Sequence, residues 1–336
     1  MGVWSLVCVM VLASCSSKRS YFPRKMELQH VDVVRFDEAI LNVSVDSSLQ
    51  DIRYLYDEYE TFMPVFTENI LGISPEDTLY LAEALPLFLE DTLYGFKETN
   101  AEVKKQFADI SDLEDKMDKA FTRFHYLYPE MPIPTVYFFI SGFNASILFM
   151  EEDIAVGTDM YLGKDYKYYS QIGMPLFVSQ RCEKKFVALD CISKALVYKY
   201  LPDKSLISLL DYIIYEGKRM YFTEMLFPKA EEQDIIEYTA EKYQWAVENQ
   251  GQVWAYIIEK DLLFSKQNET IRQFVEDNPF TKPFVNTSPG RMGAFLGWKI
   301  VQGYMENNPE VSLAKLMEMT DSQMILNKSG YKPKRR

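Results

Sequence analysis

Histidine is scarce in this chain. Its 336 residues include two, His30 and His125, and neither lies near a cluster of other potential metal ligands in the sequence. Imidazole is the commonest zinc ligand and the usual general base near neutral pH. The scarcity therefore excludes most metal and general-base chemistry. We interpret both histidines as structural residues and expect no cofactor.

The chain also lacks a long hydrophobic run. Residues 2–11 are apolar, but a membrane-spanning helix needs about 20 such residues, so this run fits a cleaved leader. Leu12-Ala13-Ser14-Cys15 follows, and a cysteine that closes a short apolar run is the acceptor pattern of a bacterial lipoprotein signal. We predict that residues 1–14 are removed and that Cys15 carries the lipid. Because no Lys or Arg precedes the run, a plain secretory signal or a short buried helix remains an alternative.

A lipid at Cys15 would hold the body on a membrane. Residues 15–27 are polar, basic and interrupted by Pro23, which is typical of a tether. Residues 28–327 then form one domain, and residues 328–336 form a basic tail. Because Ser16 and Ser17 are not followed by acidic residues, we expect an outer-membrane anchor with the body facing the periplasm.

Few cysteines remain in the processed chain. Cys182 and Cys191 would be the only two besides Cys15, and the oxidising envelope permits a disulfide between them. If the helix expected from residue 184 extends back to Cys182, their Cα atoms lie about 13 Å apart, which is too far for a bridge. We therefore favour two buried thiols.

The chain lacks a basic stripe as well. Its formal net charge is −13, whereas a nucleic-acid surface needs clustered positive charge. Nucleic acid is therefore excluded as a partner. The partners that remain are the membrane, through the lipid, and other proteins of the cell envelope.

The periodicity of apolar residues predicts an α+β fold that is mostly helical, with a small, mainly antiparallel sheet. Alternating residues from Val31 to Phe36 indicate a first strand, and Gly142-Phe143 is expected to join two hairpin strands. The expected strands are 31–36, 135–141, 144–150 and 154–161. The expected helices are 49–71 with a bend at Pro64, 74–89, 101–128, 184–200, 204–222, 231–247, 251–264, 268–277, 290–307 and 311–319.

One predicted helix carries residues that could belong to a degenerate active site. Tyr215, Glu216 and Arg219 occupy the positions of His, Glu and His in the His-Glu-x-x-His motif, whose histidines share one helix face and bind one zinc ion. Arginine stays protonated and cannot ligate a metal. The order of elements resembles a zincin-like metallopeptidase domain, which implies that architecture without its metal site. An ordinary amphipathic helix is the alternative.

Several segments occur together in a recognisable order. These are the lipobox, residues 154–163 (IAVGTDMYLG), residues 214–218 (IYEGK) and residues 288–301 (SPGRMGAFLGWKIV). In this combination the chain resembles the gliding motility lipoprotein GldB family of Bacteroidota over essentially its whole length. The resemblance implies a lipid-anchored envelope protein of the gliding and secretion apparatus, without enzymatic activity.

The segment 288–301 contains a candidate contact surface. Gly293 and Gly297 lie four residues apart and leave one helix side bare, and Trp298 follows them. We favour packing inside the domain over a partner contact at this segment.

The preferred function is therefore that of a non-catalytic docking protein. Two alternatives stay open, namely a metal-dependent hydrolase with atypical ligands and a chaperone-like module that adds a peptide strand at the sheet edge near residues 154–161.

Overall fold

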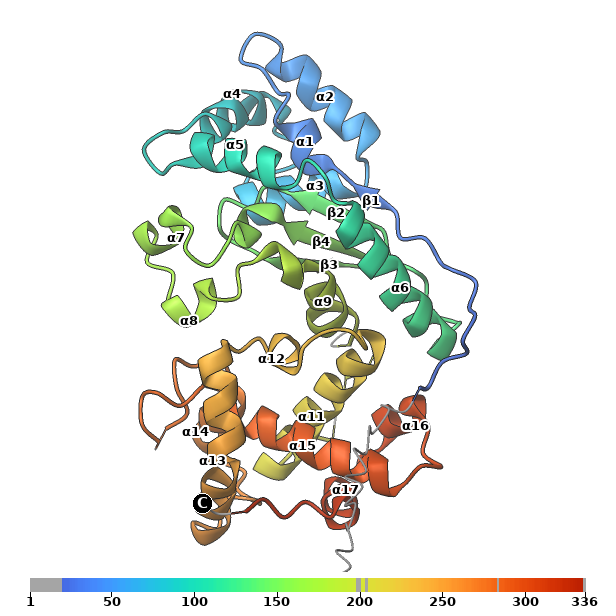
Figure 1. Cartoon of the computed structure of the whole chain (residues 1–336). Helices are drawn as coiled ribbons and strands as arrows, with labels where there is room; N and C mark the ends of the chain where they lie inside the picture. The colour runs from blue at the N-terminus through green and yellow to red at the C-terminus, as the bar shows by residue number, and fades with distance from the viewer. Residues whose placement is uncertain (1–19, 198–200, 203–204, 283, 335–336) are drawn as a thin grey trace, which may run out of the picture.

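The computed structural model describes residues 20–334 except 198–200, 203–204 and 283. The leader 1–14 and Cys15 lie outside the described residues. Figure 1 shows an elongated molecule with a sheet and its helices at one end and a helical half at the other. No helix in the described part of the chain is both long and apolar enough to span a bilayer.

In the described residues, four strands form one mixed sheet, in the order β1-β2-β4-β3. Their bounds are β1 Val33–Val34, β2 Val136–Phe139, β3 Ile147–Met150 and β4 Asp153–Gly157. The α+β, mostly helical fold class is confirmed. The sheet itself is mixed rather than mainly antiparallel, because β1 with β2 and β2 with β4 pair in parallel, and β3 with β4 pairs antiparallel.

The hairpin expected at Gly142-Phe143 was wrong. Both residues do have positive φ, but buried Asp159 accepts hydrogen bonds from the backbone N–H groups of Ser141 and Phe143, at 2.7 and 2.6 Å. These bonds fasten the loop beside the end of β4. The chain therefore passes from β2 to the edge strand β3 and returns through the 151–152 turn to β4.

The strand expected at 154–161 is present, but it is shorter than expected and its position at the sheet edge was wrong. Strand β4 ends at Gly157 and lies between β2 and β3, so its backbone is paired on both sides. Residues Thr158–Tyr161 form a 3-10 helix, η2. A peptide cannot add to β4, which removes the chaperone-like alternative in the form that the sequence suggested.

Helices surround the sheet at the N-terminal end (Figure 1). The expected helix 49–71 is interrupted near Tyr59 rather than at Pro64, and the expected helix 101–128 is divided at residues 107–110. The helices here are α1 Phe36–Ile40, α2 Ser48–Glu58, α3 Phe62–Phe66, π-helical η1 Thr67–Leu71, α4 Thr78–Leu89, α5 Phe96–Gln106 and α6 Ser111–Leu127.

Short helices connect the two halves. They are α7 Lys167–Gln171, α8 Leu176–Ser179, 3-10 helix η3 Lys184–Phe186, α9 Val187–Asp190 and π-helix η4 Cys191–Leu196. Both Cys182 and Cys191 are buried free thiols, as favoured from the sequence.

The C-terminal half is helical. Its longest buried helix, α11, starts at Leu209 rather than near 204, because Ser208 and Asp211 form a reciprocal capping box. The expected break between residues 247 and 251 is absent. The helices are α11 Leu209–Leu226, α12 Glu232–Ile235, α13 Ala240–Glu259, α14 Asn268–Val275, α15 Met292–Asn307, α16 Leu313–Glu318 and α17 Ser322–Ser329.

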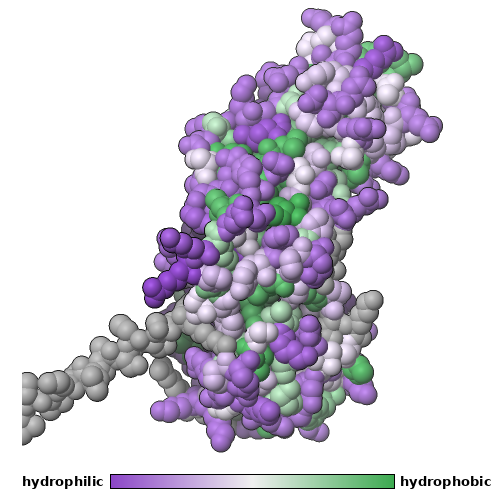
Figure 2. All heavy atoms as spheres, turned by 90° about the vertical axis from the view of Figure 1, so that its right-hand side faces the viewer, coloured by the Kyte–Doolittle hydropathy of each residue, from purple (hydrophilic) through white to green (hydrophobic). Residues whose placement is uncertain are grey.

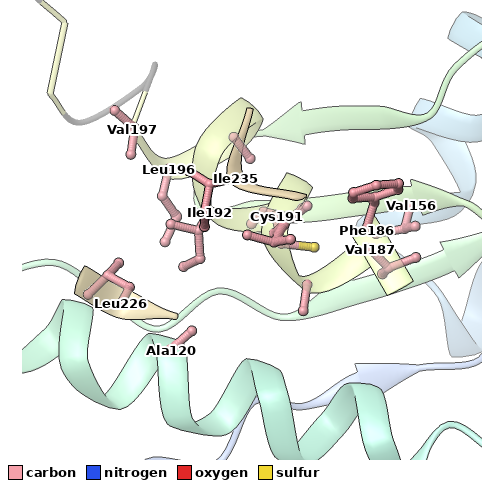
Figure 3. Packing of buried hydrophobic residues seen from close by; sticks show 14 of the residues in the cluster. Ala120, Val156, Phe186, Val187, Cys191, Ile192, Leu196, Val197, Leu226 and Ile235 are labelled. Carbon is pink, nitrogen blue, oxygen red and sulfur yellow. The ribbon is translucent and has the colours of Figure 1, made fainter. Parts of the chain in front are cut away.

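One hydrophobic core connects the two halves. Figure 3 shows Cys191, Ile192 and Leu196 among side chains that come from the sheet, from α6 and from the C-terminal half. Val156 of β4 and Leu226 of α11 belong to this same cluster. The short helices 184–196 therefore act as the shared packing layer, which holds the two halves in a fixed arrangement.

Helices α11 and α15 approach each other at two glycines. A Cβ atom on Gly297 would lie 1.8 Å from the carbonyl oxygen of Ile213, and one on Gly217 would lie 2.2 Å from the carbonyl group of Gly297. Both obstacles are backbone atoms that cannot rotate away. The glycines of the segment 288–301 therefore serve packing inside the domain.

Gly297→Ala should destabilise the protein. The added methyl group must push α11 and α15 apart, and overpacking of this kind costs about 3 kcal/mol. Urea unfolding followed by tryptophan fluorescence measures the change. An unaltered unfolding midpoint would show that the helices can separate without cost.

The beginning of the described chain is packed on the body. The hydroxyl groups of Tyr21 and Tyr221 lie 2.8 Å apart, and the rings of Phe22 and Tyr126 meet edge to face at 6.2 Å. The segment expected as a tether, 15–27, is therefore docked from Tyr21 onward. Likewise, the expected basic tail 328–336 begins within α17.

Candidate functional site

A cavity of about 850 Å³ opens beside α11. Tyr215, Glu216 and Arg219, the three residues singled out in the sequence, all line it. They share one face of α11 because residues three and four apart are neighbours on a helix. The volume lies in the range of sites that bind small ligands or peptide segments.

Arg219 is held by two partners at this cavity. Its Nη1 atom lies 2.6 Å from Oε2 of Glu216, and its Nη2 donates to the backbone carbonyl of Ser193 at 2.8 Å. The side chains of Arg219 and Glu216 are 8% and 13% exposed, so this ion pair is largely shielded from water. The position that the second histidine would take in a His-Glu-x-x-His pattern thus holds a cation fixed by its partners.

A second group of charges lies at the same cavity around Glu237, which follows α12. Its carboxylate makes ion pairs with Arg181 at 3.0 Å, with Lys194 at 2.7 Å and with Arg291 at 3.3 Å. Arg181 and Arg291 also reach Asp277, at 3.0 and 3.3 Å. We call these five residues the Glu237 cluster. It joins two residues of the connecting segment, Arg181 and Lys194, to residues of the helical half.

A buried aspartate extends the Glu237 cluster toward the sheet. Lys194 lies 2.9 Å from Oδ2 of Asp190, which also accepts a 2.6 Å hydrogen bond from the hydroxyl of Tyr161. In the described residues, the other carboxylate oxygen of Asp190 is buried without a hydrogen-bond partner. Asp190 lies behind the cavity wall rather than on it, since the lining includes Lys194 and Glu237 but not Asp190.

Burial and neighbouring charges set the protonation of these groups. Burial, opposed by Lys194 and reinforced by Glu237, raises the pKa of Asp190 to about 7. Burial alone would also raise the pKa of Glu237, but Lys194, Arg181 and Arg291 together hold it well below its usual range. Of the two neighbouring carboxyl groups, Glu237 is therefore the stronger acid and Asp190 the weaker one.

The backbone is unusual at the same place. Four of the described non-glycine residues have positive φ, and two of them, Glu237 at 59° and Arg291 at 55°, are ion-pair partners. Such conformations cost about 1 kcal/mol or more for residues with a Cβ atom. Strained residues of this kind gather at functional sites, so the backbone supports a role for the Glu237 cluster.

The cavity is lined by equal numbers of basic and acidic side chains and by several apolar ones. Apolar lining comes from Met220, Ile235, Ile271 and Val275. Four basic and four acidic side chains line the rest, namely Lys194, Arg219, Arg272 and Arg291 with Glu216, Glu237, Glu276 and Asp277. The arrangement suits a partner that presents apolar and polar groups together rather than a purely anionic ligand.

In the part of the chain that the structure describes, no three His, Cys, Asp or Glu side chains lie close enough together to hold a metal ion. His30 Nδ1 lies 3.0 Å from Asp118, and His125 Nδ1 lies 3.2 Å from the carbonyl of Met131. Both histidines thus have local structural partners.

The candidate contact segment on α15 is interior. Trp298 is fully buried, and its Nε1 donates to Glu224 at 2.9 Å. Gly293 faces the carbonyl of Phe274, and Gly297 faces Ile213. Gly293, Gly297 and Trp298 therefore pack within the domain, as favoured from the sequence. They are not exposed for contact with a partner.

The sequence did not reveal the Glu237 cluster. Its members lie between residues 181 and 291 on separate elements, so no local spacing connects them. Arg291 lies within the segment 288–301 that carries the family resemblance, where a charged residue precedes a hydrophobic helix. That was the one signal in the sequence that pointed to the cluster.

The fold and the site define a mostly helical α+β protein with a charged cavity beside its shared core. The family model described as gliding motility protein GldB matches residues 22–333. The chain belongs to this family and is thus associated with gliding motility. Searches of curated proteins and of solved structures found no match to the chain.

Proposed function

We propose that this protein is a non-catalytic, lipid-anchored component of the gliding motility and associated secretion apparatus, and that it docks another envelope protein. Membership of the GldB family over residues 22–333 is the observation that carries the proposal. The lipobox that ends at Cys15 supplies the anchor. The body then faces the periplasm from the outer membrane.

The arrangement of α11 supports a non-catalytic role. A zincin-type hydrolase needs imidazole at positions 215 and 219 and a carboxylate at 216 that is free to polarise water. Here position 219 is an arginine, which cannot bind a metal. Its guanidinium forms an ion pair with the Glu216 carboxylate at 2.6 Å. The two side chains therefore form a fixed part of the cavity wall and are not arranged to activate water.

The cavity beside α11 is the proposed docking site. Its balanced charges and apolar lining match a polypeptide segment, which carries backbone amides and mixed side chains. The Glu237 cluster connects the short helices between the halves to the helical half, so it holds the cavity walls in place before a partner arrives. A preorganised site binds more tightly because less conformational freedom is lost on association.

Filling the cavity should abolish docking. Val275→Trp places a bulky ring on a lining position of α14. We expect most of the partner crosslinking in intact cells to be lost when a photoreactive residue is placed at Asn268 on the lining. The measurement is the yield of the crosslinked adduct, identified by mass spectrometry.

Val247→Trp is the matched control, since Val247 lies on α13 and is 37% exposed. It should leave crosslinking unchanged. Crosslinking that survives Val275→Trp at the level of the control would show that the partner binds elsewhere.

A further inference from the structure

The docked start of the chain is a strap that runs along α6. After the contacts of Tyr21 and Phe22, the N–H of Gln29 donates to Thr122 Oγ1 at 2.8 Å. The N–H of Val31 donates to Asp118 Oδ1 at 2.8 Å. Residues 21–31, which we call the strap, thus follow α6 from its C-terminal end toward its N-terminal end and then enter β1.

The strap fixes where the chain leaves the body. Ser20, the first described residue, lies next to the Tyr21–Tyr221 contact near the end of α6. Figure 1 shows this start of the chain on one side of the molecule, between the end of α6 and α16, whereas α4 and α5 lie at the upper end. Any attachment that precedes Ser20 therefore acts on this side of the elongated body, away from α4 and α5.

The length of chain before the strap is small. Cys15 precedes Ser20 by five residues, which span at most about 18 Å when fully extended. A lipid on Cys15 would hold the exit point of the strap within this distance of the headgroups. A free tether through residue 28 would instead reach about 50 Å and would leave the body free to tumble.

The chemistry of the strap region fits a lipid surface. Residues 16–27 contain four basic residues, Lys18, Arg19, Arg24 and Lys25, and one acidic residue, Glu27, in a chain whose net charge is −13. Each basic residue near an anionic bilayer is attracted to it. Figure 2 shows that the face bearing the strap is mostly hydrophilic, with separate hydrophobic patches, so contact with headgroups is favoured over insertion.

We propose that docking of Tyr21 and Phe22 shortens the lipid tether, so that the side of the molecule formed by the strap, the end of α6 and α16 rests on the membrane surface. The end formed by α4 and α5 then lies farther from the bilayer than this side. This inference rests on the proposed lipid attachment at Cys15.

The test supplies the anchor chemically, so that it does not depend on lipidation in the cell. The processed chain that begins at Cys15 is coupled through that thiol to a maleimide lipid in phosphatidylethanolamine and phosphatidylglycerol vesicles. Cys182 and Cys191 are 5% and 0% exposed and stay unmodified. A clickable amino acid is encoded either at Glu130, near the end of α6, or at Leu93, between α4 and α5, and it carries the donor dye. The acceptor dye is attached to lipid headgroups.

Energy transfer should be at least about three times larger from position 130 than from position 93, because the short tether fixes the side that carries position 130 near the bilayer. In the double variant Tyr21→Ala and Phe22→Ala, the ratio should fall toward one. Equal transfer from the two positions, larger transfer from position 93, or a ratio that the double variant leaves unchanged would overturn the proposal. Failure of lipidation in cells would be seen separately, by fractionation.

Discussion

Cys15→Ala should release the protein from membranes and abolish its function. Lipoproteins carry two or three acyl chains, and each buried CH₂ contributes about 0.8 kcal/mol to membrane binding. We therefore expect the variant in the soluble fraction, and motility lost with it. Fractionation after a carbonate wash, together with colony spreading, measures both effects.

Cys182→Ala is the matched control, because Cys182 is a buried free thiol of the body. It should stay in the membrane fraction and support spreading. A Cys15→Ala variant that remains membrane-bound after the wash would refute anchoring through this residue.

Glu237→Gln should unfold the protein at markedly lower denaturant concentration. The substitution keeps the shape of the side chain but removes the negative charge that Arg181, Lys194 and Arg291 share. Breaking a buried ion pair from one side leaves uncompensated buried charge and costs about 3 to 5 kcal/mol. Urea unfolding of the chain without its lipid, followed by tryptophan fluorescence, gives the loss.

Glu276→Gln provides the comparison for that experiment. Glu276 pairs with Arg272 on the surface, where the two side chains are 50% and 68% exposed. Exposed pairs contribute about 0 to 1 kcal/mol, so this variant should unfold close to the unaltered protein. Equal losses in the two variants would show that the Glu237 cluster is not a structural element of the cavity.

Local patterns in the sequence predicted much of the helical half. The helix expected at 290–307 is α15, Met292–Asn307, because an apolar repeat marks it, but it begins two residues later than Ser288-Pro289 predicted, after Arg291 with its positive φ. Tyr215, Glu216 and Arg219 reached one cavity because a shared helix face follows from their spacing alone. These features depend on residues close together in the chain.

The sheet and the Glu237 cluster depend on contacts between distant residues. Strand β4 lies between β2 and β3 because Asp159 fastens the 141–143 loop, a bond across 16 to 18 residues that no periodicity reveals. The partners of Glu237 are 43 to 56 residues away along the chain. Such pairings can be inferred only once the fold has brought the elements together.

The central claim is that the cavity beside α11 docks a partner and performs no catalysis. Glu216→Gln tests it most directly, because the amide removes the only acid retained from the zincin pattern while its oxygen can still accept from Arg219. In a strain that lacks the chromosomal gene, the variant should restore colony spreading to the level of the unaltered protein. Loss of spreading by a variant that is folded, membrane-bound, present in normal amount and still crosslinked to the partner through position 268 would contradict the account.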